Sequence, residues 1–301
     1  MDTGLPHGGV VRDTRSPRVR GYESHETSAR AIRLLKASHP APSVTVSVVI
    51  TALAVAAGRG VYGSILVAAS VLCGQLSVGW CNDRVDLQRD MAAGRGDKPL
   101  VTSDLSPRSV TVAAACALAL CVPLSLANGL LAGAAHLVGV GGAWSYNLGV
   151  KRTALSPLPY ALGFGLLPAF VTLALPGHPW PAAWAIAAAA LLGVGAHAAN
   201  VLPDIDADLD AGVRGLPQRL GARRARFLAA TALLAATLLL VLAPPGPIGV
   251  VGWCGLGATG VLALAVALPA RDPRSRVPFL AVLGLALLDV ALLLLRGGAL
   301  S

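Results

Sequence analysis

Charged and aromatic side chains are scarce in this chain. Of its 301 residues, 13% are charged and 4% are aromatic, whereas a typical soluble domain has about a quarter of its residues charged. Hydrophobic residues make up 55% of the chain, and the mean hydropathy is +0.68. This composition excludes an ordinary soluble domain. The five cysteines form no CxxC pair, so their spacing does not indicate a zinc or redox site.

Apolar runs close to the length of a membrane span recur along the chain. A helix needs about 20 apolar residues to cross a bilayer, and turn signals such as Asn128-Gly129 separate the runs. We therefore predict an all-α polytopic membrane protein, with residues 1–41 as a disordered basic tail and 42–301 as the transmembrane domain. The nine predicted spans are Ser43–Gly58, Val61–Trp80, Val110–Leu126, Leu130–Trp144, Pro157–Leu175, Trp180–Val201, Phe227–Leu242, Ile248–Leu268 and Val277–Leu295.

The distribution of basic residues supports this count and predicts an orientation. Nine spans place 22 of the 24 Lys and Arg residues on the side of the N-terminal tail, and leave Arg59 and Arg296 on the other side. Because cytoplasmic loops hold the excess of Lys and Arg, we expect a cytoplasmic N-terminus and an external C-terminus in the cell membrane. The net charge of +9 is then explained by topology and by attraction to anionic lipids, and no nucleic-acid partner is expected.

A row of polar residues marks the cytoplasmic end of the second span. Asn82, Asp86 and Asp90 follow one another at steps of four residues, and Gln75 lies seven residues before Asn82. If the helix continues, this spacing places all four side chains on one face, while Asp83 points elsewhere. The row therefore extends from the membrane into the cytoplasmic loop.

A second row follows the sixth span, where His197, Asn200, Asp204 and Asp208 are spaced by three, four and four residues. Two helices would thus carry carboxylates at the same depth and on the same side of the membrane. Such carboxylates repel one another strongly at low dielectric, so a cation is expected between them. Carboxylate and amide oxygens suit Mg²⁺, which commonly binds carboxylates together with substrate phosphates.

Basic residues near both rows suggest a phosphorylated substrate. Arg95 and Lys98 follow the first row, Lys151 and Arg152 follow the fourth span, and Arg214 follows the second row. Each is also explained by the excess of positive charge in cytoplasmic loops. Lys98 and Lys151 are the stronger candidates for phosphate ligands.

The two acidic segments resemble the motifs of a known family. "NDRVDLQRD" is similar to the NDxxDxxxD motif of the UbiA-type intramembrane prenyltransferases, and "DIDAD" followed by "LPQRLG" resembles their second motif. "GDKPL" and "YNLGVKRTALSPLPYALG" also resemble family segments. The chain departs from the pattern at Lys151, which lies five residues after Tyr146 where several relatives have four, and at "VRGLP", where many relatives have a Thr before the Leu.

The resemblance implies a nine-helix bundle around a central cavity, with a cytoplasmic cap that binds an isoprenyl diphosphate through Mg²⁺. Asn82, Asp86 and Asp90 would hold one Mg²⁺, and Asp204 and Asp208 the other. The implied catalytic residues are Asp86, Asp204, Lys151 and Tyr146. Those implied for diphosphate binding are Arg95, Lys98, Lys151 and Arg152, and those for the acceptor or cavity are Gln75, His197 and Asn200.

Three functions agree with these residues. The first is transfer of the isoprenyl group to an acceptor, expected to be aromatic, in quinone or lipid biosynthesis. The second is a terpene cyclase of the same family, which ionises the diphosphate without an acceptor. The third is a membrane transporter, which would need polar residues across the whole bilayer. Asp289 lies inside the ninth span; an intramembrane carboxylate suggests a function, although a protonated Asp within the bundle also explains it.

Overall fold

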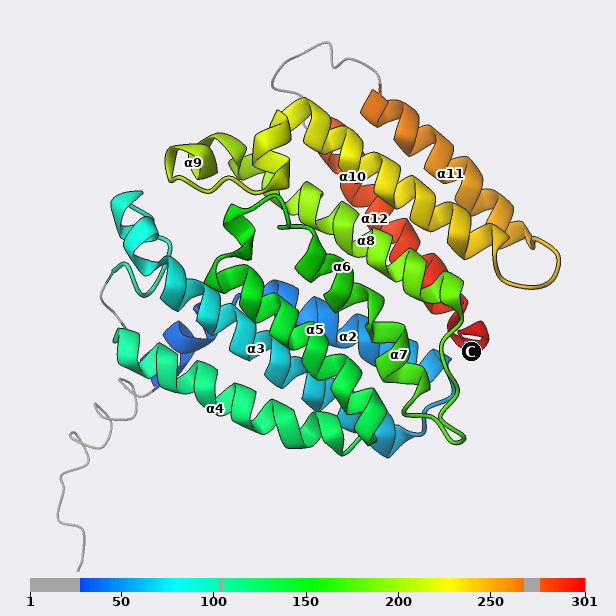
Figure 1. Cartoon of the computed structure of the whole chain (residues 1–301), viewed down its shortest axis with the longest axis horizontal. Helices are drawn as coiled ribbons and strands as arrows, with labels where there is room; N and C mark the ends of the chain where they lie inside the picture. The colour runs from blue at the N-terminus through cyan, green and yellow to red at the C-terminus, as the bar shows by residue number, and fades with distance from the viewer. Residues whose placement is uncertain (1–27, 103–104, 268–276, 301) are drawn as a thin grey trace, which may run out of the picture.

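The computed structural model describes residues 28–102, 105–267 and 277–300, and every regular element within these ranges is a helix (Figure 1). The longer helices run side by side as a bundle. Their bounds are α2 Pro40–Ala56, α3 Val61–Ala92, α4 Pro107–Leu126, α5 Leu130–Leu148, α6 Leu158–Gly165, α7 Leu167–Thr172, α8 Ala183–Val201, α9 Ile205–Asp210, α10 Leu216–Leu242, α11 Val250–Ala267 and α12 Val277–Leu295. Short 3₁₀ turns lie at Val150–Arg152 (η1), Leu202–Asp204 (η2) and Gly297–Ala299 (η3).

The predicted apolar spans fall on these helices. Four helical stretches, Val61–Ala92, Pro107–Leu126, Ala183–Asp210 and Leu216–Leu242, are long and apolar enough to cross a membrane, and a fifth candidate is a bent pair. The all-helical membrane architecture is therefore confirmed, whereas the number of spans stays a prediction. The eighth predicted span ends at Leu268, and residues 268–276 lie outside the described ranges.

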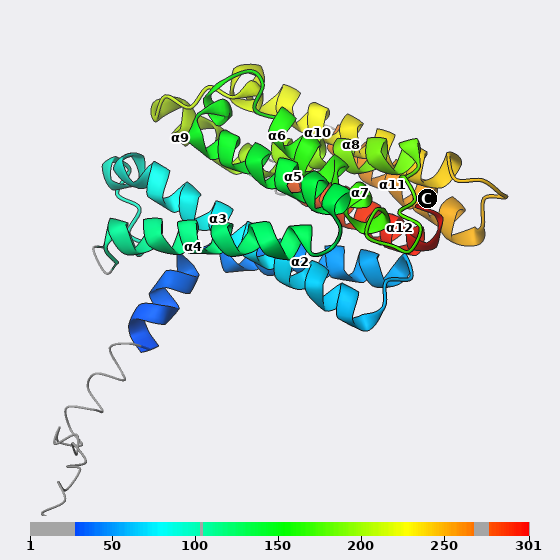
Figure 2. The same cartoon turned by 60° about the horizontal axis from the view of Figure 1, so that its bottom comes forward.

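The prediction of a disordered tail over residues 1–41 is wrong at its C-terminal end. Ser28–Lys36 is a helix, and it meets α2 at an angle of 71°. Figure 2 shows this short blue helix projecting from the side of the bundle formed by α2, α3 and α4. Pro40 begins α2, as expected where a proline has no amide proton to donate and its φ suits the first turn. Residues 1–27 lie outside the described part of the chain.

The interior is packed mainly with small and aliphatic side chains. Phe170 of α7, Leu53 of α2 and Leu240 of α10 belong to one cluster of buried residues, and Leu233 and Leu285 belong to a second. Small residues allow membrane helices to approach closely. Gly193 of α8 is an example, because a Cβ there would lie 2.4 Å from the carbonyl oxygen of Tyr160. This contact brings α6 against α8 beside the polar end of the bundle.

The acidic and basic segments gather at one end of the bundle. Figure 1 shows the C-terminal end of α3, the start of α4, η1 and α9 together on the left, whereas the α10–α11 connection and the C-terminus lie at the opposite end. Chain segments far apart in sequence, from residue 82 to residue 218, therefore meet at a single polar end.

Candidate active site

The first acidic row lies on an unbroken helix. α3 runs for 32 residues, from Val61 to Ala92, so the expected continuation past the apolar run is confirmed. Asp86 and Asp90 are both 2% exposed. Asp83, which the spacing predicts to point away from this row, is instead buried beside it at 3% exposed and shares Lys98 with Asp90. Carboxylates are almost never this buried unless they are paired, and each of these three has a cationic partner.

Three basic side chains neutralise this row. The Lys151 ammonium lies 2.5 Å from Asp86 Oδ1, and Arg89 donates to Asp86 Oδ2 at 2.9 Å. Lys98 Nζ lies 2.7 Å from Asp90 Oδ2 and 2.9 Å from Asp83 Oδ1. The two lysines come from different loops, one after α3 and one at η1. Both sequence-predicted lysines therefore reach the acidic row.

Asn82 is held in place by a neighbouring helix. Its side-chain amide donates to Asn147 Oδ1 at 3.1 Å, and Asn147 in turn donates to the carbonyl oxygen of Val78 at 3.0 Å. Because this bond uses the N–H of Asn82, the carbonyl oxygen of Asn82 is the atom suited to a metal ion.

The second acidic row is not on one continuous helix, which corrects the expectation of a single stripe. α8 ends at Val201, a 3₁₀ turn covers Leu202–Asp204, and α9 begins at Ile205. Pro203 lies in that turn, and a proline cannot donate the backbone hydrogen bond that would continue α8. His197 and Asn200 both lie in α8 before this break, the first buried and the second exposed, and Asp204 in the 3₁₀ turn is exposed.

Asp208 is the member of the second row that faces the first. It is half-buried and accepts a hydrogen bond from Gln218 Nε2 at 2.8 Å. Arg89 Nη1 lies 3.9 Å from Asp208 Oδ1, and Arg89 also pairs with Asp86 and Asp90. The two rows thus meet at one guanidinium group. The sequence reading missed Arg89, although it lies three residues after Asp86 and such neighbours face each other on a helix.

The two lysines differ in their electrostatic balance. For Lys98, burial lowers the pKa, but hydrogen bonds to the Asp90 and Asp83 carboxylates outweigh burial and leave the pKa raised. For Lys151, burial dominates over the attraction of Asp86, and the pKa is lowered. Lys98 is thus the more firmly charged of the two. The positive charge of Lys151 is stabilised by one carboxylate, that of Asp86, and its side chain is more buried than that of Lys98.

The other predicted basic residues lie farther out. Arg95 is exposed and forms an ion pair with Asp97 at 3.1 Å. This contact with Asp97 raises the pKa of Arg95, and the more distant charges of Asp90 and Asp204 raise it further. Arg152 and Arg214 are exposed. None of these three side chains is buried among the carboxylates of the acidic rows.

An aromatic cluster lies next to Lys151. The rings of Tyr146 and Tyr160 meet edge to face with centroids 5.3 Å apart, and the His197 ring lies 5.6 Å from the first and 4.7 Å from the second. His197 Nε2 is 3.0 Å from Ser156 Oγ, which also accepts from the backbone N–H of Leu216. Tyr160 and Ser156 were not among the predicted site residues.

Gln75 is half-buried on α3, seven residues from Asn82.

The donor set fits Mg²⁺. In the described residues, no group of three or more His, Cys, Asp or Glu side chains is arranged around a common metal position, and basic side chains lie among the carboxylates instead. Aspartate and asparagine oxygens are hard ligands, which match Mg²⁺ rather than zinc. Arg89, Lys98 and Lys151 give carboxylates of the two rows cationic partners, and Mg²⁺ would supply charge of the same sign.

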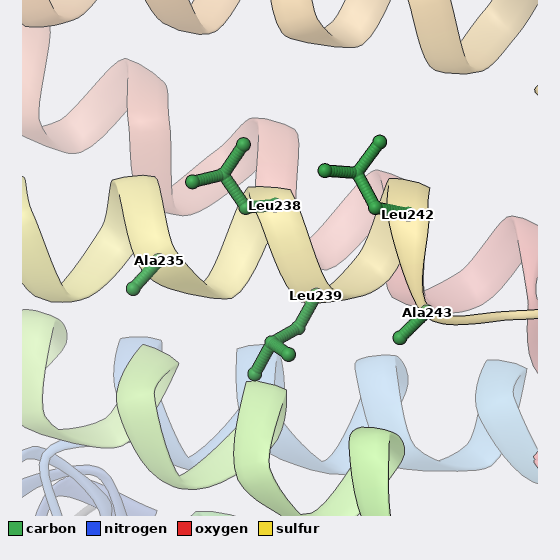
Figure 3. Close-up of a pocket in the computed structure, with 5 residues that line it drawn as sticks. All are labelled: Ala235, Leu238, Leu239, Leu242 and Ala243. Carbon is green, nitrogen blue, oxygen red and sulfur yellow. The ribbon is translucent and has the colours of Figure 1, made fainter.

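Two other features lie away from the acidic rows. Asp289 is fully buried on α12 and accepts a hydrogen bond from Thr237 of α10. Figure 3 shows an apolar hollow at the far end of α10, lined by Ala235, Leu238, Leu239, Leu242 and Ala243. Neither feature contributes a group that could bind a diphosphate.

Comparisons with known proteins agree on one family. A sequence model described as the UbiA prenyltransferase family matches residues 45–292. The bacteriochlorophyll synthase 33 kDa chain of Cereibacter sphaeroides is 30% identical over 232 residues, which cover 71% of this chain and 72% of that protein.

Solved structures show the same fold. A UbiA homolog from Archaeoglobus fulgidus bound to DMAPP and Mg²⁺ superposes with a TM-score of 0.68 at 18% identity, over 89% of this chain and 98% of that one. The apo structure of a UbiA homolog from Aeropyrum pernix K1 gives a TM-score of 0.63 at 20% identity, over 83% and 97% of the two chains.

Proposed function

The chain belongs to the UbiA prenyltransferase family, and from that premise we propose that it transfers an isoprenyl group from an isoprenyl diphosphate to an aromatic acceptor with the help of Mg²⁺. The observation that carries this proposal is the meeting of the two acidic rows at Arg89, which pairs with Asp86, Asp90 and Asp208. Acidic groups from two separate segments can therefore act on one ligand.

The metal ligands proposed are Asn82, Asp86 and Asp90 for one Mg²⁺, and Asp204 and Asp208 for the other. The first three lie on one face of α3, and the last two lie on η2 and α9. When bound, Mg²⁺ would neutralise the charge that develops on the diphosphate oxygens. Asp83 is left out of this set because it does not share the four-residue spacing that places Asn82, Asp86 and Asp90 on one face of α3.

Lys98 and Lys151 are proposed to bind the diphosphate directly. Both ammonium groups lie at the first row, and fixed positive charge stabilises a leaving diphosphate without transferring a proton. The exposed Arg95 and Arg152 are proposed to guide the diphosphate as it arrives. Long-range attraction of this kind raises the rate of association more than the final affinity.

The proposed reaction breaks the bond between the allylic carbon and the diphosphate oxygen. The acceptor forms the new carbon bond and loses a proton, while diphosphate leaves with the electron pair of the broken bond. Tyr146, five residues before Lys151 in sequence and next to Tyr160 in space, is proposed to line the site near the reacting carbon. The apolar walls of the bundle would exclude water, which would otherwise capture the cation.

The remaining parts of the assignment follow from the membrane architecture. We propose a nine-helix bundle around a central cavity that admits the isoprenyl chain from the bilayer, with the acidic end in the cytoplasm of the cell and the C-terminus outside. Gln75, His197 and Asn200 are proposed to face the cavity or the acceptor. The relative named bacteriochlorophyll synthase supports including chlorophyll-type macrocycles among the acceptors to be tested.

The test is turnover of the purified protein with Mg²⁺, a series of isoprenyl diphosphates and a series of aromatic acids and macrocycles, followed by mass spectrometry. We expect a prenylated acceptor and free diphosphate. Asp86→Ala and Asp204→Ala should abolish diphosphate release, while Asp206→Ala, an exposed neighbour in the same acidic segment, should not. A cyclised hydrocarbon formed without acceptor would identify a cyclase, and full turnover in Asp86→Ala would refute the metal assignment.

A further inference from the structure

We propose that His39 is a positioning residue that holds Lys98 ready for the diphosphate by sharing Asp83 with it. This inference rests on the proposed role of Lys98 in binding the diphosphate. It assigns a function to the junction between the N-terminal helix Ser28–Lys36 and α2, which lies outside both acidic motifs.

Asp83 is a buried anchor between two basic groups. His39 Nε2 lies 2.8 Å from Asp83 Oδ1, and Lys98 Nζ lies 2.9 Å from the same oxygen. Lys98 also reaches Asp90 Oδ2 at 2.7 Å. The ammonium is thus fixed between Asp83 and Asp90, and His39 fixes the carboxylate that holds it on one side.

The backbone at His39 is adapted to this contact. His39 has φ 54 and ψ 64, a left-handed conformation that few residues other than glycine adopt. It lies where the chain turns by 71° between the Ser28–Lys36 helix and α2. A histidine at a position that favours glycine indicates that its imidazole is retained for a contact, and the contact observed is with Asp83.

The turn is fastened to α3 independently of the imidazole. A Cβ on Gly79 would lie 2.1 Å from the carbonyl oxygen of Ser38, so only glycine permits this approach. One residue later, Trp80 Nε1 donates to the carbonyl oxygen of Leu34 at 2.8 Å. Gly79, Trp80 and Asp83 therefore present one face of α3 to the turn, which should stay in place when the His39 side chain is removed.

Loss of the imidazole should affect substrate binding more than chemistry. Without it, Asp83 Oδ1 has only Lys98 as a partner, and the carboxylate can rotate and draw the ammonium away from the diphosphate. Residues that orient a ligand-binding group in this way typically change affinity by roughly 10-fold to 100-fold. The effect should appear in KM for the isoprenyl diphosphate, with kcat within about 2-fold because the reacting atoms are untouched.

The experiment compares His39→Gly with His178→Gly. His178 is the other described non-glycine residue with positive φ, at 50°, and it contacts the carbonyl oxygen of Leu173 at the opposite end of the bundle. Both substitutions relieve the same backbone strain, but only the first removes a partner of Asp83. We expect His39→Gly to raise KM about 10-fold and His178→Gly to leave KM unchanged. His39→Gln, whose side-chain N–H can replace Nε2, should recover most of the loss.

Lys98→Ala makes the result decisive. If His39 acts through Lys98, the double variant His39→Gly/Lys98→Ala should have the same KM as Lys98→Ala alone. An unchanged KM in His39→Gly, or additive effects in the double variant, would overturn the positioning role while the diphosphate role of Lys98 stands. An unchanged KM in Lys98→Ala would overturn the proposed diphosphate role and this inference together. Thermal unfolding of each variant identifies any loss of folded protein.

Discussion

The two acidic rows differ in the continuity of the backbone that carries them, in their burial and in their pairing with basic side chains. Asp83, Asp86 and Asp90 lie on an unbroken helix, are almost fully buried and are each paired with a basic side chain. Asp204 and Asp208 lie on a 3₁₀ turn and a six-residue helix, where Asp204 is exposed and Asp208 is half-buried. The first row is preorganised before any ligand arrives, whereas the second can adjust to it.

This difference suggests that the two rows contribute differently to fold stability and to ligand binding. Buried charges cost free energy unless they are paired, so removing one partner from an ion pair of the first row should destabilise the fold. In the second row Asp204 is exposed and Asp208 is half-buried, so this row should contribute less to stability, and its proposed role is to complete the coordination of a metal–diphosphate complex. Substitutions in the first row should therefore damage folding and activity, and substitutions in the second row should damage activity alone.

The largest effect is expected for Asp86→Asn. This change leaves Lys151, which is 4% exposed, without its carboxylate, and breaking a buried pair costs about 3 kcal/mol. Loss of a metal ligand should also lower turnover by roughly 10²–10³-fold. Diphosphate release and thermal unfolding measure the two losses.

The double variant Asp86→Asn/Lys151→Met separates these effects. Replacing a buried ion pair by apolar groups is often neutral for stability, so the melting temperature should recover while activity stays lost. Recovery of activity would show that turnover needs neither Asp86 as a metal ligand nor Lys151 as a diphosphate ligand.

A smaller effect is expected for Asp208→Asn. Its amide can still accept the hydrogen bond from Gln218, so the melting temperature should change little. Activity should fall about 10-fold to 100-fold at limiting Mg²⁺ and recover in part at high Mg²⁺. The measurement is the Mg²⁺ concentration for half-maximal activity, and a value equal to that of the unaltered protein would remove Asp208 from the metal site.

Arg89→Gln tests the contact between the rows. Without this guanidinium, Asp86, Asp90 and Asp208 repel one another until a metal binds. The metal-free protein should melt at a lower temperature, and added Mg²⁺ should raise the melting temperature more than it does in the unaltered protein. Equal Mg²⁺-induced shifts in the two proteins would mean that the rows do not share a metal.

The smallest effect is expected for Asp289→Asn. Asp289 is as buried as the first row but contacts the Thr237 hydroxyl, and no ion pair of Asp289 occurs among the described residues. An asparagine can accept the same hydrogen bond, so turnover should stay within about 2-fold. A large loss in turnover would show that burial of a carboxylate in this bundle marks function even without a cationic partner.

The sequence predicts the first row better than the second for a physical reason. Steps of four residues specify one face only if the helix is continuous, and no residue between Val61 and Ala92 interrupts α3. In the second row Pro203 stands directly before Asp204, and it marks the break that separates His197 from Asp208. The spacing of the polar residues favours a continuous helix, whereas the proline indicates the break that the structure has.

Contacts between distant segments could not be derived from spacing. Arg89 reaches Asp208 across 119 positions, and His39 reaches Asp83 across 44. Such pairs depend on how α3 packs against α2 and against the α8–α10 region, which the order of residues along the chain does not specify. Lys98 and Lys151 are predictable because a basic side chain near a motif suits a phosphate. Ser156 and Tyr160 lie in the same segment as Lys151, but their uncharged side chains give no electrostatic reason to expect a site residue.

The most direct test of the shared metal site is a crystal structure with Mn²⁺ in place of Mg²⁺ and a non-hydrolysable isoprenyl diphosphate analogue, read by anomalous scattering. The prediction is two metal peaks joined by the diphosphate, one within coordination distance of Asn82, Asp86 and Asp90, and the other within that distance of Asp204 and Asp208. Metal bound by the α3 carboxylates alone, with Asp204 and Asp208 still in solvent, would contradict it.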